Sequence, residues 1–154
     1  MSEPRRSLPA RPNVIWRLFV VSQLVGTLLE REFARLELTA RDFAVLSTIG
    51  ATTAITPRDL AELLGMPATT LSAVLKRLEE PGAVRRRRNP EDGRSVLLEL
   101  TAEGRARMEA AAPALRRAVA ALDEALEAPV DQLQDALEAY ERAARRALDG
   151  TASS

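Results

Sequence analysis

Two short amphipathic segments separated by only two residues constrain this chain more than any other feature. The first is predicted to form a helix from Pro57, because Thr56 is a good capping residue and proline suits the first helical position. The second is predicted to begin near Pro67 and to end before Pro81-Gly82. Gly65 lies between them, where so tight a turn needs a positive φ. This spacing predicts a helix-turn-helix, although a generic helical hairpin shares part of the pattern.

A β-hairpin is predicted directly after this motif. Two extended segments, about 84–88 and 95–100, flank the turn-forming run Asn89-Pro-Glu-Asp-Gly93. A helix-turn-helix followed by such a hairpin is typical of a winged helix. We therefore predict a fold that is mainly α with a small β-hairpin wing.

Further helices are predicted on both sides of this unit. One covers about 13–35, and the next begins after the capping box formed by Thr39 and Asp42. Another begins after Thr101, and a last one follows Pro129. Together with the helix-turn-helix, these segments give about six helices.

The length of 154 residues suits one domain with an oligomerisation element. A proline- and arginine-rich arm over 1–12 and a small polar tail over 149–154 are expected to be disordered. The single domain is expected over 13–148. Within it, 37–104 would form a DNA-binding head, whereas 13–35 and 105–148 would form dimerisation helices.

The first helix carries two apolar stripes, which implies two packing partners, only one of which has to belong to the same chain. The last helix continues an apolar pattern as well. These patterns predict a homodimer formed through the N- and C-terminal helices. The residues expected at the dimer interface are Leu18, Val25, Leu133, Leu137 and Tyr140.

Several functional classes are excluded by composition. The chain contains neither histidine nor cysteine, which removes histidine general bases, thiol nucleophiles, disulfides and the usual zinc sites. No nucleophile–base pair or phosphate-binding glycine loop is visible, so we expect no enzyme, no cofactor and no metal. The apolar stretch Val14–Leu29 contains Arg17 and is too short for a membrane span, so a cytoplasmic protein is expected.

The charges are balanced over the chain, with 22 basic and 22 acidic side chains, but they are unevenly distributed. Residues 76–94 carry seven basic against four acidic side chains. A basic segment in a neutral chain indicates a surface that faces a polyanion.

The second helix of the helix-turn-helix has an outer face of small, hydroxylated or basic side chains. Such a face can enter the major groove of DNA, where Ser and Thr bond to base edges. A solvated face of an ordinary amphipathic helix is the alternative. The residues expected to contact DNA from this helix are Thr69, Thr70, Ser72, Ala73, Lys76 and Arg77.

The hairpin supplies the second part of the predicted interface. Arg86, Arg88 and Arg94 are expected to contact DNA, since arginine at a wing tip can enter a narrow minor groove or bind phosphates. Asp92 is expected to be structural, pairing with an arginine to stiffen the loop. For Arg85 and Arg87, a solvated edge strand remains the alternative.

Five stretches of this sequence together resemble the MarR (multiple antibiotic resistance regulator) family of winged-helix repressors, and the order of elements agrees over the whole chain. In this resemblance, Arg94 matches the family's wing arginine and Asp92 its wing aspartate. Pro67 stands where a Ser or Thr cap often opens the recognition helix, and Pro81 replaces a common basic residue. The stretches are Leu60-Ala-Glu-Leu-Leu-Gly-Met, Leu71-Ser-Ala-Val-Leu-Lys-Arg-Leu-Glu, Gly82-Ala-Val-Arg-Arg, Asp92-Gly-Arg94 and Leu100-Thr-Ala-Glu-Gly104.

The resemblance implies a bacterial transcriptional repressor that binds a near-palindromic operator in double-stranded DNA as a homodimer. It also implies release by a small, frequently aromatic ligand. Trp16, Phe19 and Phe43 are candidates for its pocket, with a role as core or dimer-interface aromatics as the alternative. The competing hypothesis for the whole chain is a winged-helix protein-interaction module without sequence-specific DNA binding.

Overall fold

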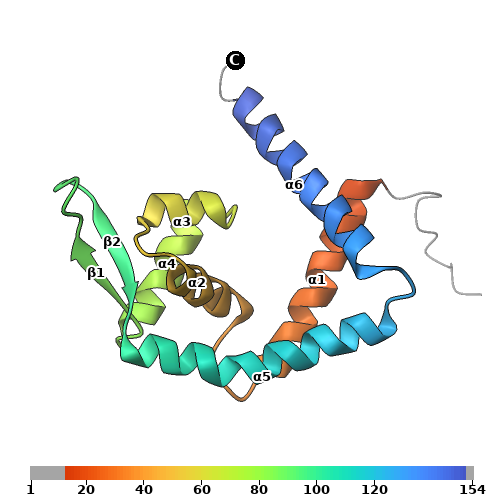
Figure 1. Cartoon of the computed structure of the whole chain (residues 1–154), viewed down its shortest axis with the longest axis horizontal. Helices are drawn as coiled ribbons and strands as arrows, with labels where there is room; N and C mark the ends of the chain where they lie inside the picture. Colours follow the sequence, from red (N-terminus) through yellow and green to blue (C-terminus); the bar gives the residue numbers. More distant parts are fainter. Residues whose placement is uncertain (1–12, 152–154) are drawn as a thin grey trace, which may run out of the picture. The chain divides into compact units, whose positions relative to one another are not determined.

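The computed structural model describes residues 13–151 of the chain. The described residues form six helices and one antiparallel hairpin, which confirms the predicted mainly α winged-helix fold (Figure 1). The predicted arm over 1–12 and the last three residues of the predicted tail lie outside the described residues. The elements are α1 (Val14–Phe33), α2 (Ala40–Ala51), α3 (Pro57–Leu63), α4 (Ala68–Glu79), β1 (Val84–Arg88), β2 (Val96–Leu100), α5 (Ala102–Ala125) and α6 (Val130–Thr151).

One boundary differs from the sequence-based expectation. Helix α6 includes residues 149–151, which the sequence pattern places in the tail, because the alanine-rich turn before them has high helix propensity. Contacts within the chain group it into two compact units, Met1–Arg116 and Arg117–Ser154, and no described side chain of α6 belongs to the buried cluster of the first. The single domain expected over 13–148 stays a prediction.

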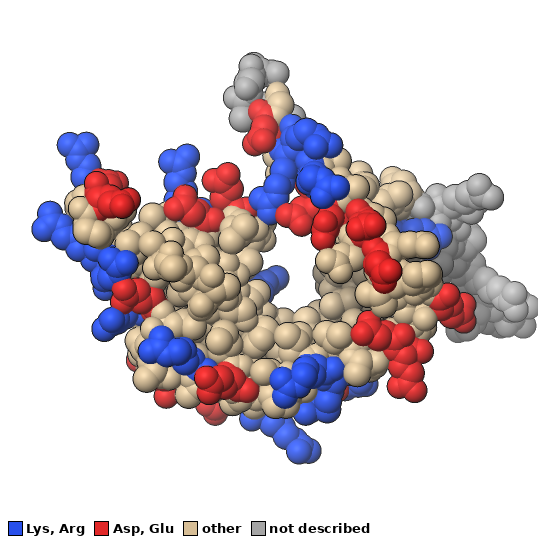
Figure 2. All heavy atoms as spheres, in the orientation of Figure 1, with Lys and Arg blue, Asp and Glu red and all other residues tan. Residues whose placement is uncertain are grey.

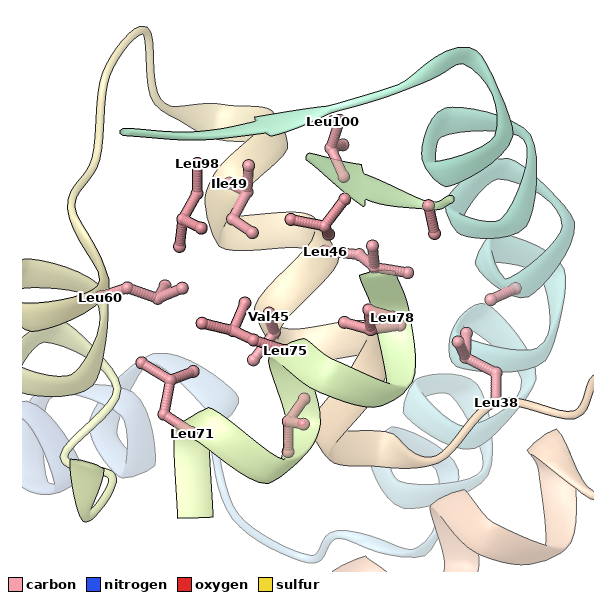
Figure 3. Packing of buried hydrophobic residues seen from close by; sticks show 14 of the residues in the cluster. Leu38, Val45, Leu46, Ile49, Leu60, Leu71, Leu75, Leu78, Leu98 and Leu100 are labelled. Atoms are coloured by element: carbon pink, nitrogen blue, oxygen red, sulfur yellow. The ribbon is translucent and has the colours of Figure 1, made fainter. Parts of the chain in front are cut away.

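The core of the first unit lies where α2, α3, α4 and the hairpin meet (Figure 3). Leu60 of α3 and Leu71 of α4 are almost fully buried, as the predicted helix-turn-helix contact requires. Gly65 connects the two helices with φ +59°, which confirms the reason for a glycine there. The labelled side chains in Figure 3 that converge on this core include Val45, Leu46, Ile49, Leu60, Leu71, Leu75, Leu78, Leu98 and Leu100.

The helix caps agree with the sequence signals at α2 and only in part at α3. Thr39 and Asp42 form the full capping box of α2. At α3, the hydroxyl oxygen of Thr56 accepts a hydrogen bond from the backbone N–H of Asp59. The backbone N–H of Thr56 does not donate to the Asp59 carboxylate in return. Pro67 caps α4 without any side-chain hydrogen bond. Helix α4 therefore depends on tertiary packing for its first turn.

The wing is tied to the rest of the head by a contact that the sequence did not reveal. Strands β1 and β2 pair with Val84 opposite Leu100 and Arg88 opposite Val96. The backbone N–H of Leu98 also donates to the carbonyl of Ile55 at 2.9 Å, which forms an isolated β-bridge between β2 and the segment before α3. The hairpin is thus held at a defined position beside the helix-turn-helix.

Across residues 13–151, no helix combines the length and hydropathy that crossing a bilayer requires.

Substituting Gly104 is expected to destabilise this arrangement. A Cβ at Gly104 of α5 would lie 2.1 Å from the carbonyl oxygen of Ala83, a backbone atom that no rotamer change can move away. We expect Gly104→Ala to lower the free energy of unfolding by about 1–3 kcal/mol, measured by urea denaturation. Gly26→Ala in α1 is the matched control, since its Cβ would meet nothing within 4 Å. Equal stability of Gly104→Ala and wild type would contradict this packing.

Candidate nucleic-acid interface

Helix α4 presents two faces of opposite character. Its apolar side chains Leu71, Val74, Leu75 and Leu78 are each at most 3% exposed and belong to the core. On the other side, the sequence-predicted residues Thr69, Ser72, Ala73 and Lys76 are exposed and Thr70 is half-buried. The structure therefore brings these five predicted residues to the outer side of α4.

The polar side chains on the outer face of α4 are available for contacts with another molecule. Among the described residues, the side chains of Thr69, Ser72 and Lys76 have no hydrogen-bond or ion-pair partner. Small hydroxylated side chains permit a close approach of the helix to another surface and leave donors and acceptors for it. Base edges in the major groove of DNA offer hydrogen-bond donors and acceptors that can pair with such side chains.

Arg77 lies differently from the other predicted residues of α4. Its Nε and Nη2 atoms lie 3.2 and 2.5 Å from Oδ1 of Asp42 on α2. Asp42 is only 2% exposed, and a buried carboxylate is costly without a charged or hydrogen-bonding partner. The DNA contact of Arg77 stays a prediction, and its guanidinium is bound to Asp42 in this structure.

Three of the four consecutive wing arginines have carboxylate partners. Arg85 and Arg87 both contact Glu99 on the neighbouring strand β2. Arg86 donates from Nε to Oε1 of Glu79 at 2.7 Å. Figure 2 shows basic side chains gathered over the region of the hairpin, at the left of the view, with acidic side chains among them. The charge of this strand is therefore partly compensated within the molecule.

Glu99 is held in its charged form by this cluster. The hydrogen bond from Arg85 lowers the pKa of Glu99 below its usual 4.5, against a smaller opposing effect of desolvation, and Arg87 lowers it further. At neutral pH the carboxylate is ionised and binds both arginines. This cluster was not expected from the sequence, although Glu99 faces Arg85 in the strand register.

The two remaining basic side chains of the wing are free of such partners. Arg88 and Arg94 are exposed and make no ion pair with any of residues 13–151. The guanidinium of Arg88 lies over Gly93, where an added Cβ would come within 3.0 Å of its Nη2. Two cations without an ion-pair partner in the described part of the chain thus occur at the wing tip, and their binding of an anion stays a prediction.

Asp92 stiffens the wing tip by a different contact from the one expected. It makes no ion pair with an arginine among the described residues. Its Oδ1 accepts a hydrogen bond from the backbone N–H of Arg94 at 3.0 Å, which is an Asx turn. Ser95 donates its N–H to the Asp92 carbonyl at 3.0 Å. A tight turn leaves backbone N–H groups without backbone partners, and the Asp92 carboxylate accepts a hydrogen bond from one of them.

A groove of about 520 Å³ in the first unit runs beside α4. No sequence signal points to it, because it forms only where α4 packs beside α1 and α2, which lie far from α4 in the sequence. Its lining includes Gln23 and Glu30 of α1, Arg41 of α2, and Thr70 and Arg77 of α4.

The three aromatic residues expected in a ligand pocket do not line this groove. Phe43 packs against Phe33, with ring centroids 5.5 Å apart, and is half-buried at the core. Trp16 and Phe19 are exposed on α1, Phe19 by 62%. Their ligand-binding role stays a prediction, and this structure does not gather them around one cavity.

The residues predicted at a dimer interface carry apolar surface in both units. Leu18 and Val25 of α1 are half-buried. On α6, Leu133, Leu137 and Tyr140 are exposed by 44%, 45% and 36%. Apolar side chains at this spacing along a helix are typical of a packing face.

Within residues 13–151, no three acidic side chains gather closely enough to hold a metal ion.

Comparison with known proteins gives a consistent family. The MarR family is matched over residues 38–96, which include α2, the helix-turn-helix and most of the hairpin. The HTH-type transcriptional regulator PecS of Dickeya dadantii is 39% identical over 94 residues, which are 59% of this chain and 57% of PecS. The multiple antibiotic resistance protein MarR of Escherichia coli is 37% identical over 89 residues, 58% of this chain and 62% of that protein. The matched part of this chain thus spans about three fifths of each of these curated relatives.

The similarity to a solved structure extends further along the chain. A MarR mutant from Escherichia coli, crystallised in complex with operator DNA, superposes with a TM-score of 0.72 at 30% identity. That match covers 84% of this chain and 92% of the solved one. The similarity therefore includes elements outside the helix-turn-helix and the wing.

Neutralising Glu99 is expected to weaken the wing in a pH-dependent way. Because the folded-state pKa of Glu99 is lowered, its stabilising contribution is present above the unfolded value of 4.5 and is lost as pH falls through the folded value. Glu99→Gln should therefore be less stable than wild type near neutral pH and equally stable in acid, as measured by urea denaturation at each pH. Glu103→Gln, which breaks an exposed pair with Arg107, is the control. A stability difference for Glu99→Gln that does not change with pH would contradict the charge cluster.

Proposed function

We propose, since the chain belongs to the MarR family, that it is a transcriptional regulator that binds specific sequences in double-stranded DNA. The observation that carries this proposal is that α4 presents an exposed polar face and the wing tip carries two arginines with no ion-pair partner among residues 13–151. One surface can read base edges, and the other can bind the phosphate backbone.

In the proposed complex, α4 enters the major groove. Thr69 and Ser72 would bond to base edges, and Ala73 allows the helix to approach them closely. Arg94 and Arg88 would lie along the adjacent minor groove or its phosphates, where a narrow groove concentrates negative potential. The Asx turn at Asp92 holds the backbone of Arg94 in place for that contact.

The proposed binding unit is a homodimer. Exposed apolar side chains on α1 and on α6 are better suited to a protein interface than to water. A two-fold dimer would present two copies of α4 to two half-sites about 10 base pairs apart, which makes the operator nearly palindromic. Such a dimer would cover a promoter, so we propose repression as the default outcome.

Release by a small aromatic ligand is part of the same proposal. A ligand needs a concave site, and the groove beside α4 has a volume in the range of small-molecule sites. An occupant there would contact Thr70 and Ala73 on the helix that reads DNA. Trp16, Phe19 and Phe43 do not line this groove, so they remain candidates only for a ligand site elsewhere in the protein.

The roles of α4 and of the wing are expected to separate by mutation. We would select duplexes of about 30 base pairs from a random pool with the wild-type chain, a length that holds two half-sites. Arg94→Ala should weaken binding to selected and scrambled duplexes alike. It should also reduce the slope of log affinity against log salt by about 0.9 for each phosphate that the variant no longer binds. Thr69→Ala and Ser72→Ala should instead lower the preference for the selected duplex, by about 1–3 kcal/mol per base contact, with an unchanged slope.

The affinity, the selectivity and the salt slope of the three variants are compared with one another and with the wild type, and circular dichroism checks that each variant is folded. If all three bind as the wild type does, or if the wild-type chain shows no salt-dependent DNA binding, the proposal fails. That outcome would favour a winged-helix module that binds an acidic protein partner.

The dimer is expected to depend on the apolar face of α6. Replacing Leu133 and Leu137 together by Glu should give a monomer or an insoluble chain, because two charges would have to be buried in the interface. Light scattering measures the outcome. The control is Arg142→Gln with Arg146→Gln, which lowers the net charge equally on the opposite side of the helix. A folded dimer that survives the Leu133 and Leu137 changes would contradict the interface.

A further inference from the structure

Two charged side chains near the end of α4 lie on its flanks, outside the proposed DNA face. Arg77 and Glu79 are two residues apart, so they point about 200° apart around a helix of 3.6 residues per turn. Arg77 contacts Asp42 of α2, and Glu79 contacts Arg86 of β1. The recognition helix is thus joined by ion pairs to a different element on each side.

The Arg77–Asp42 pair is fixed to a rigid part of α2. One carboxylate oxygen of Asp42, Oδ2, accepts hydrogen bonds from the N–H and hydroxyl of Thr39 at 2.9 and 2.8 Å, which is the capping box of that helix. The other, Oδ1, accepts two bonds from Arg77. Asp42 is 2% exposed, so Arg77 is the charged partner that balances it away from water.

The Glu79–Arg86 pair is anchored to the hairpin. Arg86 lies opposite Leu98 in the strand register, and the N–H of Leu98 is bound to the Ile55 carbonyl. The Glu79 and Arg86 side chains are 30% and 45% exposed, so this pair is the weaker of the two. It nevertheless gives α4 a second directional contact on its opposite flank.

The rotation of α4 about its axis matters for reading bases. Apolar burial is non-directional, so the core-facing leucines hold α4 in place more firmly than they fix its rotation. A rotation of roughly 10° moves an atom about 5–6 Å from the axis by about 1 Å. A hydrogen bond tolerates less than that, since its donor–acceptor distance varies by only about 0.5 Å.

We infer that the Arg77–Asp42 and Glu79–Arg86 ion pairs are positioning contacts that set the rotation of α4, and that Arg77 and Arg86 do not themselves touch DNA. The inference rests on the proposed function and revises the predicted contact set. Sequence selectivity then depends on Asp42, a residue of a different helix with its carboxylate buried inside the protein.

The test is a double-mutant cycle on Asp42 and Arg77, with the selected and scrambled duplexes as probes. Asp42→Asn and Arg77→Met should each reduce the ratio of selected to scrambled affinity roughly tenfold, the equivalent of one base contact. The double variant should be no less selective than either single one, because the same pair is broken in all three. The salt slope should stay at the wild-type value, since every phosphate contact is retained.

Two matched controls separate positioning from loss of folding or of charge. Asp59→Asn removes the corresponding cap carboxylate of α3, which has no arginine partner among the described residues, and should leave selectivity unchanged. Lys76→Met removes a cation from the exposed face of α4 and should make the salt slope shallower. If Asp42→Asn does not fold, Arg77→Met and Arg77→Lys carry the test, with the lysine expected to restore part of the selectivity.

Each outcome decides between the two proposals. A shallower salt slope for Arg77→Met, with unchanged selectivity for Asp42→Asn, would mean that Arg77 contacts phosphate and would overturn this inference alone. A purely additive double variant would overturn it as well. A wild-type chain that does not distinguish selected from scrambled DNA would overturn the proposed function, and the positioning role with it.

Discussion

The apolar contact between α2, α3, α4 and the hairpin is the interaction on which the rest of the structure depends. Helix α3 has only seven residues, too few to be stable alone in water, and α4 has no side-chain cap. Both exist because Leu60 and Leu71 are removed from water against α2. A buried leucine of this kind contributes about 2–5 kcal/mol relative to alanine, a large part of the stability of a small domain. The polar face of α4 is a consequence, since it is the face that this core leaves outside.

Charge pairing within the head decides which basic side chains remain for a polyanion. The sequence places seven basic residues between 76 and 94, all of which are equivalent by composition. In the structure, Asp42, Glu79 and Glu99 bind four of the arginines, and three cations stay without partners among the described residues. An ion pair and a phosphate contact compete for the same guanidinium, so the acidic residues of the head restrict the proposed DNA-binding surface as much as the basic ones form it.

The two compact units differ in how far they bury their own apolar side chains. The first unit has its own buried core. The second consists of the end of α5 and of α6, whose apolar side chains are exposed. An amphipathic helix gains most of its stability by burying its apolar face, so α6 is expected to be stabilised by association. In the proposed homodimer, association and folding of the second unit would be one process.

The sequence by itself determined the element order, most element limits and the two faces of α4. Those features follow from contacts within about four residues, such as the capping box of Thr39 and Asp42 or the positive φ of Gly65, and from periodicity along one helix. Only the tertiary structure decided which partner each charged side chain takes. Arg77 and Asp42 are 35 residues apart, and their contact depends on the docking of α4 against α2. Because that docking is set by packing of the whole core, no local pattern predicts it, and the groove beside α4 has the same origin.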